Sequence, residues 1–291
     1  MNNNELEKKS SRGGYISEHQ LSMYFIFTFA ITWGIAVAVL IFMPWLVQIW
    51  GPLSLDNPYY FTLWMIAVYG PPISAFSIIF ISYGKNGLKI YLKRLLNWRF
   101  GVIGIVLLIS IPIIGTCANF IYIAMGGQPK ELSEPWYILL LLSVFMLIYD
   151  PGPMEELGWR GVLLPELQKK YSPLISAMVV GILWGLWHFP SYLIALGTLG
   201  VNFIPYFVIS GPISFIGLSV VMVMVYNKSK GSLFIMILMH YTITMTGMLF
   251  VRLDLTFAQT LVHTSLSFIL YVIVGALFII YNKKDWIFVK S

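Results

Sequence analysis

The chain has 291 residues, of which 58% are hydrophobic and only 10% are charged. A soluble domain usually carries about 25% charged residues, so this composition excludes an ordinary water-soluble protein. The 20 Phe, 17 Tyr and 10 Trp residues exclude a disordered chain, because such side chains demand burial. The single cysteine, Cys117, excludes an intramolecular disulfide framework and any metal site built from several cysteines. These exclusions leave a membrane protein with several spans.

Eight apolar stretches have about the length of 20 residues that a helix needs to cross a bilayer. A backbone in lipid must satisfy its own hydrogen bonds, so we expect every stretch to be helical. The predicted fold is therefore an all-α bundle of about eight transmembrane helices. The stretches cover residues 22–48, 60–83, 101–125, 136–158, 173–195, 204–226, 232–250 and 261–281.

Positive charges divide unequally between the two sides that these spans define. One side carries 16 of the 18 Lys and Arg residues, and the other carries only Lys130 and Arg252. The positive-inside rule then predicts a multi-pass protein of the plasma membrane with both termini in the cytoplasm. The net charge of +6 follows from this orientation, so no nucleic-acid partner is expected.

The chain shows no internal repeat and no second soluble domain. We expect a disordered cytoplasmic arm over residues 1–20 and one membrane-embedded domain over 21–291, with its motifs in a core at 136–250. The basic segment 85–100 alternates Lys or Arg with apolar residues at helical spacing. This pattern fits an amphipathic helix on the inner headgroups and fits a plain basic loop equally well.

Three polar clusters interrupt the apolar stretches. They are DPGPMEELGWR at 150–160, WGLWH at 184–188, and His240 with the hydroxyl residues that follow it. Ionisable side chains inside a membrane are costly, so each cluster is a candidate functional site.

Counting along the helices brings the three clusters to a similar depth. The turn between the fourth and fifth spans lies near Tyr171, because the next two residues, Ser-Pro, suit a helix start. Glu155 precedes this turn by 16 residues and His188 follows it by 17, so both lie about 25 Å from its tip at 1.5 Å per residue. His240 lies about 15 Å from its own cytoplasmic loop. We expect one buried pocket in the cytoplasmic half of the membrane.

Helical geometry assigns chemistry within this pocket. Glu156 and Arg160 are four residues apart and can pair on one face. Glu155 is rotated by about 100° from Glu156, which leaves it free to activate water as a general base. His188 and His240 can bind a metal, donate to an oxyanion or share the water. Taken singly, each histidine also fits a helix–helix hydrogen bond and the Glu–Arg pair fits a structural role. The joint occurrence at one depth favours function.

These motifs carry a family resemblance. The EELGWR segment at 155–160 resembles the EExxxR motif of the CAAX protease and bacteriocin-processing (CPBP, or Abi) family of intramembrane proteases. The WGLWH segment at 184–188 is similar to its second motif, an aromatic residue four positions before a histidine. His240 and Thr244 fall where the family has His-x-x-x-Asn. Thr244 departs from that pattern, because a hydroxyl is a shorter donor than an amide.

The resemblance implies an eight-helix endopeptidase that hydrolyses membrane-associated or lipidated peptides and proteins. It implies that Glu155 activates water and that His188 holds the water or a metal. It implies that Glu156 and Arg160 brace the site, and that His240, aided by Thr244, stabilises the oxyanion. The family is called a metalloprotease family, yet a metal-free glutamate mechanism is also argued for it. Zinc held by Glu155, His188 and His240 is left open.

Other classes of protein are weighed against this one. A catalytically inactive immunity or scaffold protein of the same fold is favoured by the unusual Thr244. An aspartyl protease would need a GxGD motif beside Tyr149-Asp150, a rhomboid-type protease a GxSG motif, and a classical zinc protease an HExxH motif. The chain contains none of these motifs. A transporter is disfavoured because no repeat symmetry is visible.

Overall fold

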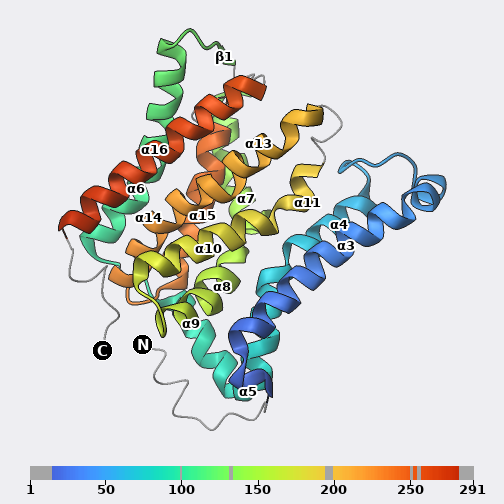
Figure 1. Cartoon of the computed structure of the whole chain (residues 1–291), viewed down its shortest axis with the longest axis vertical. Coiled ribbons are helices and arrows are strands. Elements are labelled where there is room, and N and C mark those ends of the chain that lie inside the picture. The colour runs from blue at the N-terminus through green and yellow to red at the C-terminus, as the bar shows by residue number, and fades with distance from the viewer. Residues whose placement is uncertain are drawn as a thin grey trace.

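The structure is a computed structural model that describes residues 15–98, 100–130, 134–193, 199–249, 252–253 and 257–281. Helices make up nearly all of the described chain, which confirms the all-α prediction (Figure 1). A short antiparallel pair joins β1 (Pro129–Lys130) to β2 (Arg252–Leu253), with Pro129 opposite Leu253.

The N-terminal third forms a helical hairpin followed by a bent helix. Asn57 caps α4 by accepting the Tyr59 N–H, and the proline after it suits the first turn. The axes of α4 and α5 differ by 47°, a bend found in a broken span and in a re-entrant loop alike. The elements are α2 (Tyr15–Glu18), α3 (Gln20–Trp50), α4 (Pro58–Val68), α5 (Gly70–Lys93) and the 3₁₀ turn η1 (Arg94–Leu96).

The segment with the first polar cluster is broken into short helices. Two prolines follow α7, and proline cannot donate the backbone hydrogen bond that a continuous helix needs. The predicted span 136–158 therefore ends as a regular helix at Tyr149. The elements are α6 (Gly101–Ala124), α7 (Trp136–Tyr149), η2 (Gly152–Glu155), α8 (Glu156–Gly158), the π-helical turn η3 (Trp159–Leu163) and α9 (Leu164–Gln168).

The C-terminal half is built around α14. This helix packs against α6, α10, α15 and α16, and its residues 221–225 are fully buried (Figure 1). The α3–α4 pair extends away from this bundle. The elements are α10 (Pro173–Trp187), α11 (Phe189–Tyr192), η5 (Gly200–Asn202), α13 (Phe203–Val208), the π-helical turn η6 (Ile209–Ile213), α14 (Ser214–Lys228), α15 (Leu233–Leu249) and α16 (Phe257–Tyr281).

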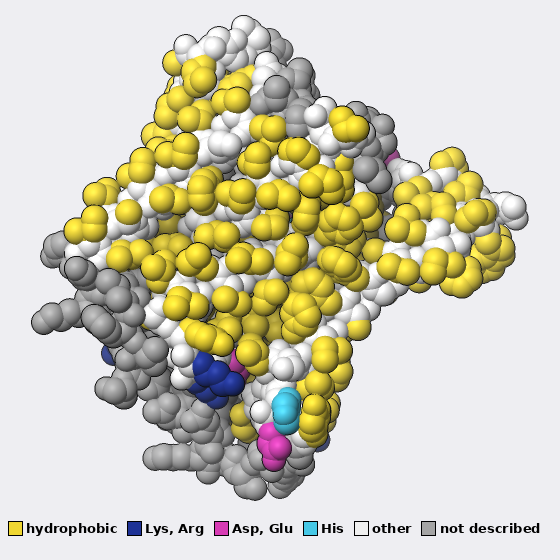
Figure 2. Space-filling model, in the orientation of Figure 1, with side chains coloured by type: hydrophobic (Ala, Val, Ile, Leu, Met, Phe, Trp, Pro, Cys, Tyr) yellow, Lys and Arg dark blue, Asp and Glu magenta, His cyan; other side chains and the backbone are white. Residues whose placement is uncertain are grey.

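Length and composition identify a multi-pass membrane protein. Within the described residues, four helical segments are long and apolar enough to cross a bilayer, namely 20–50, 104–124, 200–228 and 261–280. The bent α4–α5 pair is a fifth if its two helices form one span, whereas α10 and α15 are apolar but shorter. The predicted number of eight spans is therefore not confirmed. Figure 2 shows hydrophobic side chains over most of one face, as expected for a surface in contact with lipid.

The structure also bears on the predicted disordered arm over residues 1–20 and on the basic segment 85–100. Residues 1–14 of the predicted disordered arm lie outside the described residues. The prediction is wrong for 15–20, because α2 and the start of α3 are helical and buried Gln20 donates to the Tyr83 hydroxyl at 2.6 Å. The segment 85–100 is helical as far as Leu96, as the amphipathic alternative predicts.

Candidate functional site

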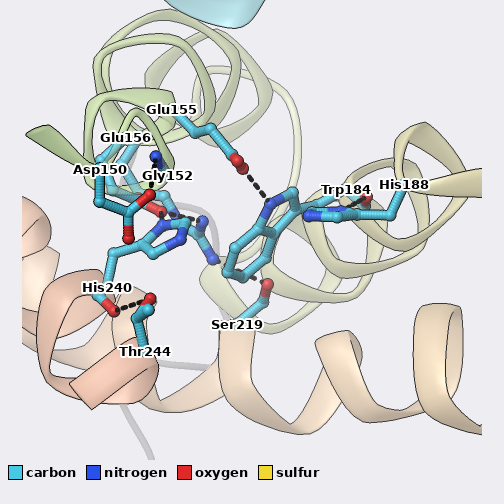
Figure 3. Close-up of polar contacts among 10 residues, drawn as sticks. Asp150, Gly152, Glu155, Glu156, Trp184, His188, Ser219, His240 and Thr244 are labelled. Atoms are coloured by element: carbon cyan, nitrogen blue, oxygen red, sulfur yellow. Dashed lines mark hydrogen bonds and ion pairs between the residues drawn. The ribbon is translucent and has the colours of Figure 1, made fainter. Parts of the chain in front are cut away.

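The candidate site lies where the short helices after α7 meet α10, α14 and α15 (Figure 3). The loop into it is fixed locally, because Asp150 Oδ1 accepts the Gly152 N–H at 2.9 Å. The chain then re-enters a helix that carries Glu155, Glu156 and Arg160 into the interior. All three of these side chains are buried.

Glu156 is the centre of a buried charge network. Its Oε1 accepts from Arg160 Nη1 at 2.9 Å and from His240 Nδ1 at 2.9 Å. Arg160 Nη2 also donates to Ser219 Oγ on α14 at 2.9 Å. Glu156 and Arg160 have no exposed surface, and charge-assisted bonds of this kind offset part of their desolvation. The network directs the second ring nitrogen of His240, Nε2, away from Glu156.

Glu155 has a different partner, as its rotation around the helix requires. Its Oε2 accepts from Trp184 Nε1 on α10 at 2.8 Å, and the residue is 2% exposed. The Arg160 guanidinium carbon lies 4.4 Å from the centre of the Trp184 ring, over its face, so the same indole contacts the cation and donates to Glu155. Glu155 is thus held by a neutral donor, whereas Glu156 is paired with a cation.

His188 lies beyond Trp184 as seen from His240 (Figure 3). Its Nδ1–H donates to the Trp184 carbonyl oxygen at 2.9 Å, and its ring packs 4.8 Å from that of Phe215. The Trp184 ring centre lies 5.4 Å from that of His240 and 6.0 Å from that of His188. His188, a predicted site residue, therefore contacts Trp184 at the edge of the site and does not join the Glu156 network.

Thr244 lies outside the network. It is an exposed residue one turn after His240, and its hydroxyl donates to the His240 carbonyl oxygen at 3.4 Å. Threonine in a helix commonly makes this bond to the residue four positions earlier. The hydroxyl therefore contacts the backbone of its own helix rather than the side chain of His240.

The residues do not fit zinc in this arrangement. Glu155, His188 and His240 were the three expected ligands. Across the described residues, no group of three or more His, Cys, Asp or Glu side chains is placed to hold a metal ion. The reason is visible in their partners: one oxygen of Glu155 is bound to Trp184, His240 Nδ1 is bound to Glu156, and the indole lies between the two imidazoles.

Three residues at the site have no individual role in the sequence analysis. Trp184 and Asp150 lie inside two of the polar clusters without being singled out, and Ser219 carries no signal among the many serines of the spans. A Cβ atom at Gly152 would lie 3.2 Å from Asp150 Oδ1 and 3.2 Å from His240 Nε2. The glycine between two prolines was the available signal that side chains converge there.

Comparisons with known proteins point to the family that the motifs resemble. The family model described as type II CAAX prenyl endopeptidase Rce1-like matches residues 133–246, which include all three polar motifs. The chain is also similar to CAAX prenyl protease 2 from Methanococcus maripaludis. The two are 26% identical over 234 residues, which is 72% of this chain and 78% of the relative.

Proposed function

Because the chain belongs to the CPBP family of intramembrane proteases, we propose that it is an endopeptidase that uses Glu155 to activate water. Its substrate in this proposal is a membrane-associated or lipidated peptide or protein. The name of the methanococcal relative and the description of the family favour a prenylated CAAX protein over a bacteriocin precursor.

The contrast between the two neighbouring glutamates is the observation that carries the proposal. Glu156 is bound to both Arg160 and His240, so its carboxylate is committed to charge pairing. Glu155 accepts one neutral hydrogen bond through Oε2, which leaves Oε1 to accept from a water molecule. A buried carboxylate with one oxygen fixed and the other available suits general-base catalysis.

The remaining groups supply the other parts of peptide hydrolysis. Glu155 takes a proton from water, and the resulting hydroxide attacks the carbonyl carbon of the substrate. A protonated Nε2 of His240 donates to the oxyanion that forms, while Glu156 and Arg160 hold that ring in place. The tetrahedral intermediate then collapses as Glu155 returns the proton to the leaving nitrogen.

We place the protein in the plasma membrane with both termini in the cytoplasm. The excess of Lys and Arg on one side of the chain supports this orientation. The site would then open toward the cytoplasmic leaflet, where lipid-modified C-termini of cytoplasmic proteins insert.

The test is cleavage of a farnesylated CAAX peptide by the purified protein in lipid nanodiscs. Glu155→Gln keeps an oxygen for the Trp184 bond but cannot take a proton, so we expect turnover to fall by about 10²–10⁴-fold. Glu18→Gln, at an exposed position in α2, is the matched control and should cleave normally. Wild-type turnover in the Glu155→Gln protein would contradict the proposal.

A second function is favoured by the placement of Thr244 away from His240. In this alternative the chain is an inactive immunity or scaffold protein that keeps the fold. A binding protein should retain its cellular phenotype in the Glu155→Gln variant, whereas a protease should lose it. The same variant therefore separates the two functions.

A further inference from the structure

Arg94 is a buried arginine directly after α5, at the start of η1, within the segment 85–100 whose sequence fits an amphipathic helix or a basic loop. Only 7% of it is exposed, whereas its lysine neighbours Lys85, Lys89 and Lys93 are exposed. Its guanidinium is planar and presents five donors in fixed directions. Arg94 uses them on segments that are far apart in the sequence.

Two of these bonds reach the helix that carries the catalytic motif. Arg94 Nη1 donates to the Gly161 carbonyl at 2.8 Å, and Nη2 donates to the Arg160 carbonyl at 3.3 Å. One turn earlier in α5, the buried Tyr91 hydroxyl donates to the Leu157 carbonyl. A Cβ atom at Gly161 would lie 2.3 Å from the Tyr91 oxygen, so the approach requires glycine. Tyr91 and Arg94 thus bind three carbonyls of the motif helix.

This part of the motif helix is a π-helical turn. The Leu164 N–H bonds to the Trp159 carbonyl, five residues earlier instead of four. A π turn is wider than an α turn and is rarely stable without outside support. The side-chain donors of Tyr91 and Arg94 supply bonds to carbonyls on either side of its start.

The other two bonds of Arg94 reach α14 and the turn before α15. These elements carry Ser219 and His240, the residues that bond to Arg160 and Glu156. Nη2 donates to the Tyr226 hydroxyl at 2.9 Å, and Nε donates to the Gly231 carbonyl at 3.0 Å. Tyr226 lies on α14, about two turns after Ser219. Gly231 lies in the turn before α15, nine residues before His240. The Arg94 guanidinium therefore joins the motif helix to α14, which carries Ser219, and to the turn before α15, which carries His240.

We propose that Arg94, supported by Tyr91, is a positioning residue for the Glu155–Glu156 site. Glu156 Oε1 is bonded from two helices at once, by Arg160 and by His240. The bond from His240 survives only if the motif helix and α15 keep their relative position, which is the position that Arg94 fixes. The inference rests on the proposed endopeptidase function. It assigns the control of that site to the end of α5.

The test compares kinetics in full-length protein in nanodiscs. Arg94→Lys keeps the charge, but a single ammonium cannot span the four acceptors. A displacement of about 1 Å at a catalytic site can cost about 10²-fold in rate, so we expect kcat to fall by roughly that amount while KM stays near the wild-type value. Tyr91→Phe removes only a hydroxyl and should lower kcat to a smaller extent. Lys93→Met is the matched control and should leave kcat unchanged.

A second measurement is independent of turnover. The chain has four histidines, so the side-chain NMR signal of His240 can be assigned in histidine-labelled protein by its loss in His240→Gln. We expect this signal to move in Arg94→Lys and Tyr91→Phe, and to stay in place in Lys93→Met. If Arg94→Lys fails to fold, the kcat and the His240 signal of Tyr91→Phe test the proposal.

The two measurements separate this inference from the proposed function. A moved His240 signal in the variants of a chain whose wild type shows no cleavage would support the positioning role and refute the protease. An active wild type whose folded Arg94 and Tyr91 variants keep both kcat and the His240 signal would refute the positioning role alone. Loss of kcat with an unmoved His240 signal would also overturn it.

Discussion

Gly185 is the point where α10 contacts the π turn η6 backbone against backbone. A Cβ atom there would lie 2.5 Å from both the N and Cα atoms of Pro212 and 2.8 Å from the carbonyl carbon of Gly211. Ordinary contact begins near 3.4 Å, so Gly185→Ala requires a separation of about 0.9 Å between two backbones. The preceding residue, Trp184, donates to Glu155 at 2.8 Å, so a shift of α10 moves the donor of this bond.

Taken up along this bond, such a shift lengthens it from 2.8 Å to about 3.7 Å, beyond the limit of hydrogen bonding at about 3.5 Å. We expect Gly185→Ala to lower the free energy of unfolding by about 1–3 kcal/mol, the usual cost of overpacking. We expect hydrolysis of the farnesylated peptide to fall by as much as about 10²-fold, because Glu155 loses its fixed geometry. Denaturant unfolding in detergent and the nanodisc cleavage assay measure the two effects.

Gly34→Ala is the matched control. It is the same substitution in the long helix α3, where a new Cβ atom would meet nothing within 4 Å. We expect normal hydrolysis and a gain in stability of about 0.5–1 kcal/mol from helix propensity. Wild-type stability and wild-type hydrolysis in Gly185→Ala would refute the reasoning, because they would mean that α10 is free to move without disturbing Glu155.

Two further predictions concern the carboxylate and the metal. Trp184→Phe removes the donor to the buried Glu155 and should lower the free energy of unfolding by about 1.5–3 kcal/mol with a reduced cleavage rate, whereas Trp98→Phe, at a site 75% exposed, should change neither. Dialysis against EDTA should leave the cleavage rate unchanged, since the described residues place no three ligands together. A rate that falls with EDTA and returns with zinc would contradict this second prediction.

Helical counting could bring the motif helix and α15 together because the rise per residue is nearly constant. The bond between Glu156 and His240 does join these two elements, across 84 positions of sequence. Counting could not fix rotation. α10 ends at Trp187 and His188 caps it, so the direction of the His188 ring depends on that ending. Counting likewise could not show that the Thr244 hydroxyl donates to the His240 carbonyl oxygen rather than to the His240 side chain.

Arg94 shows a different limit of sequence reasoning. Its neighbours are lysines at helical spacing, which is the pattern of a basic surface. Its bonding partners lie 66 to 137 residues away, so only the tertiary fold identifies it as buried. The number of spans could not be predicted from hydropathy for a similar reason. An apolar stretch such as 136–158 is continuous in sequence, but prolines end its regular helix at Tyr149.

The π turn at Trp159–Leu163 has a consequence for how this gene can diverge. A π turn contains one residue more than the α turn it replaces, so loss of a single codon there would restore a regular helix. Everything upstream would then rotate by about 100° relative to everything downstream. The two adjacent glutamates would turn away from Trp184 and His240 although all four of these residues were retained. Natural selection should therefore remove single-codon deletions within Trp159–Leu163 more often than it removes most single substitutions there.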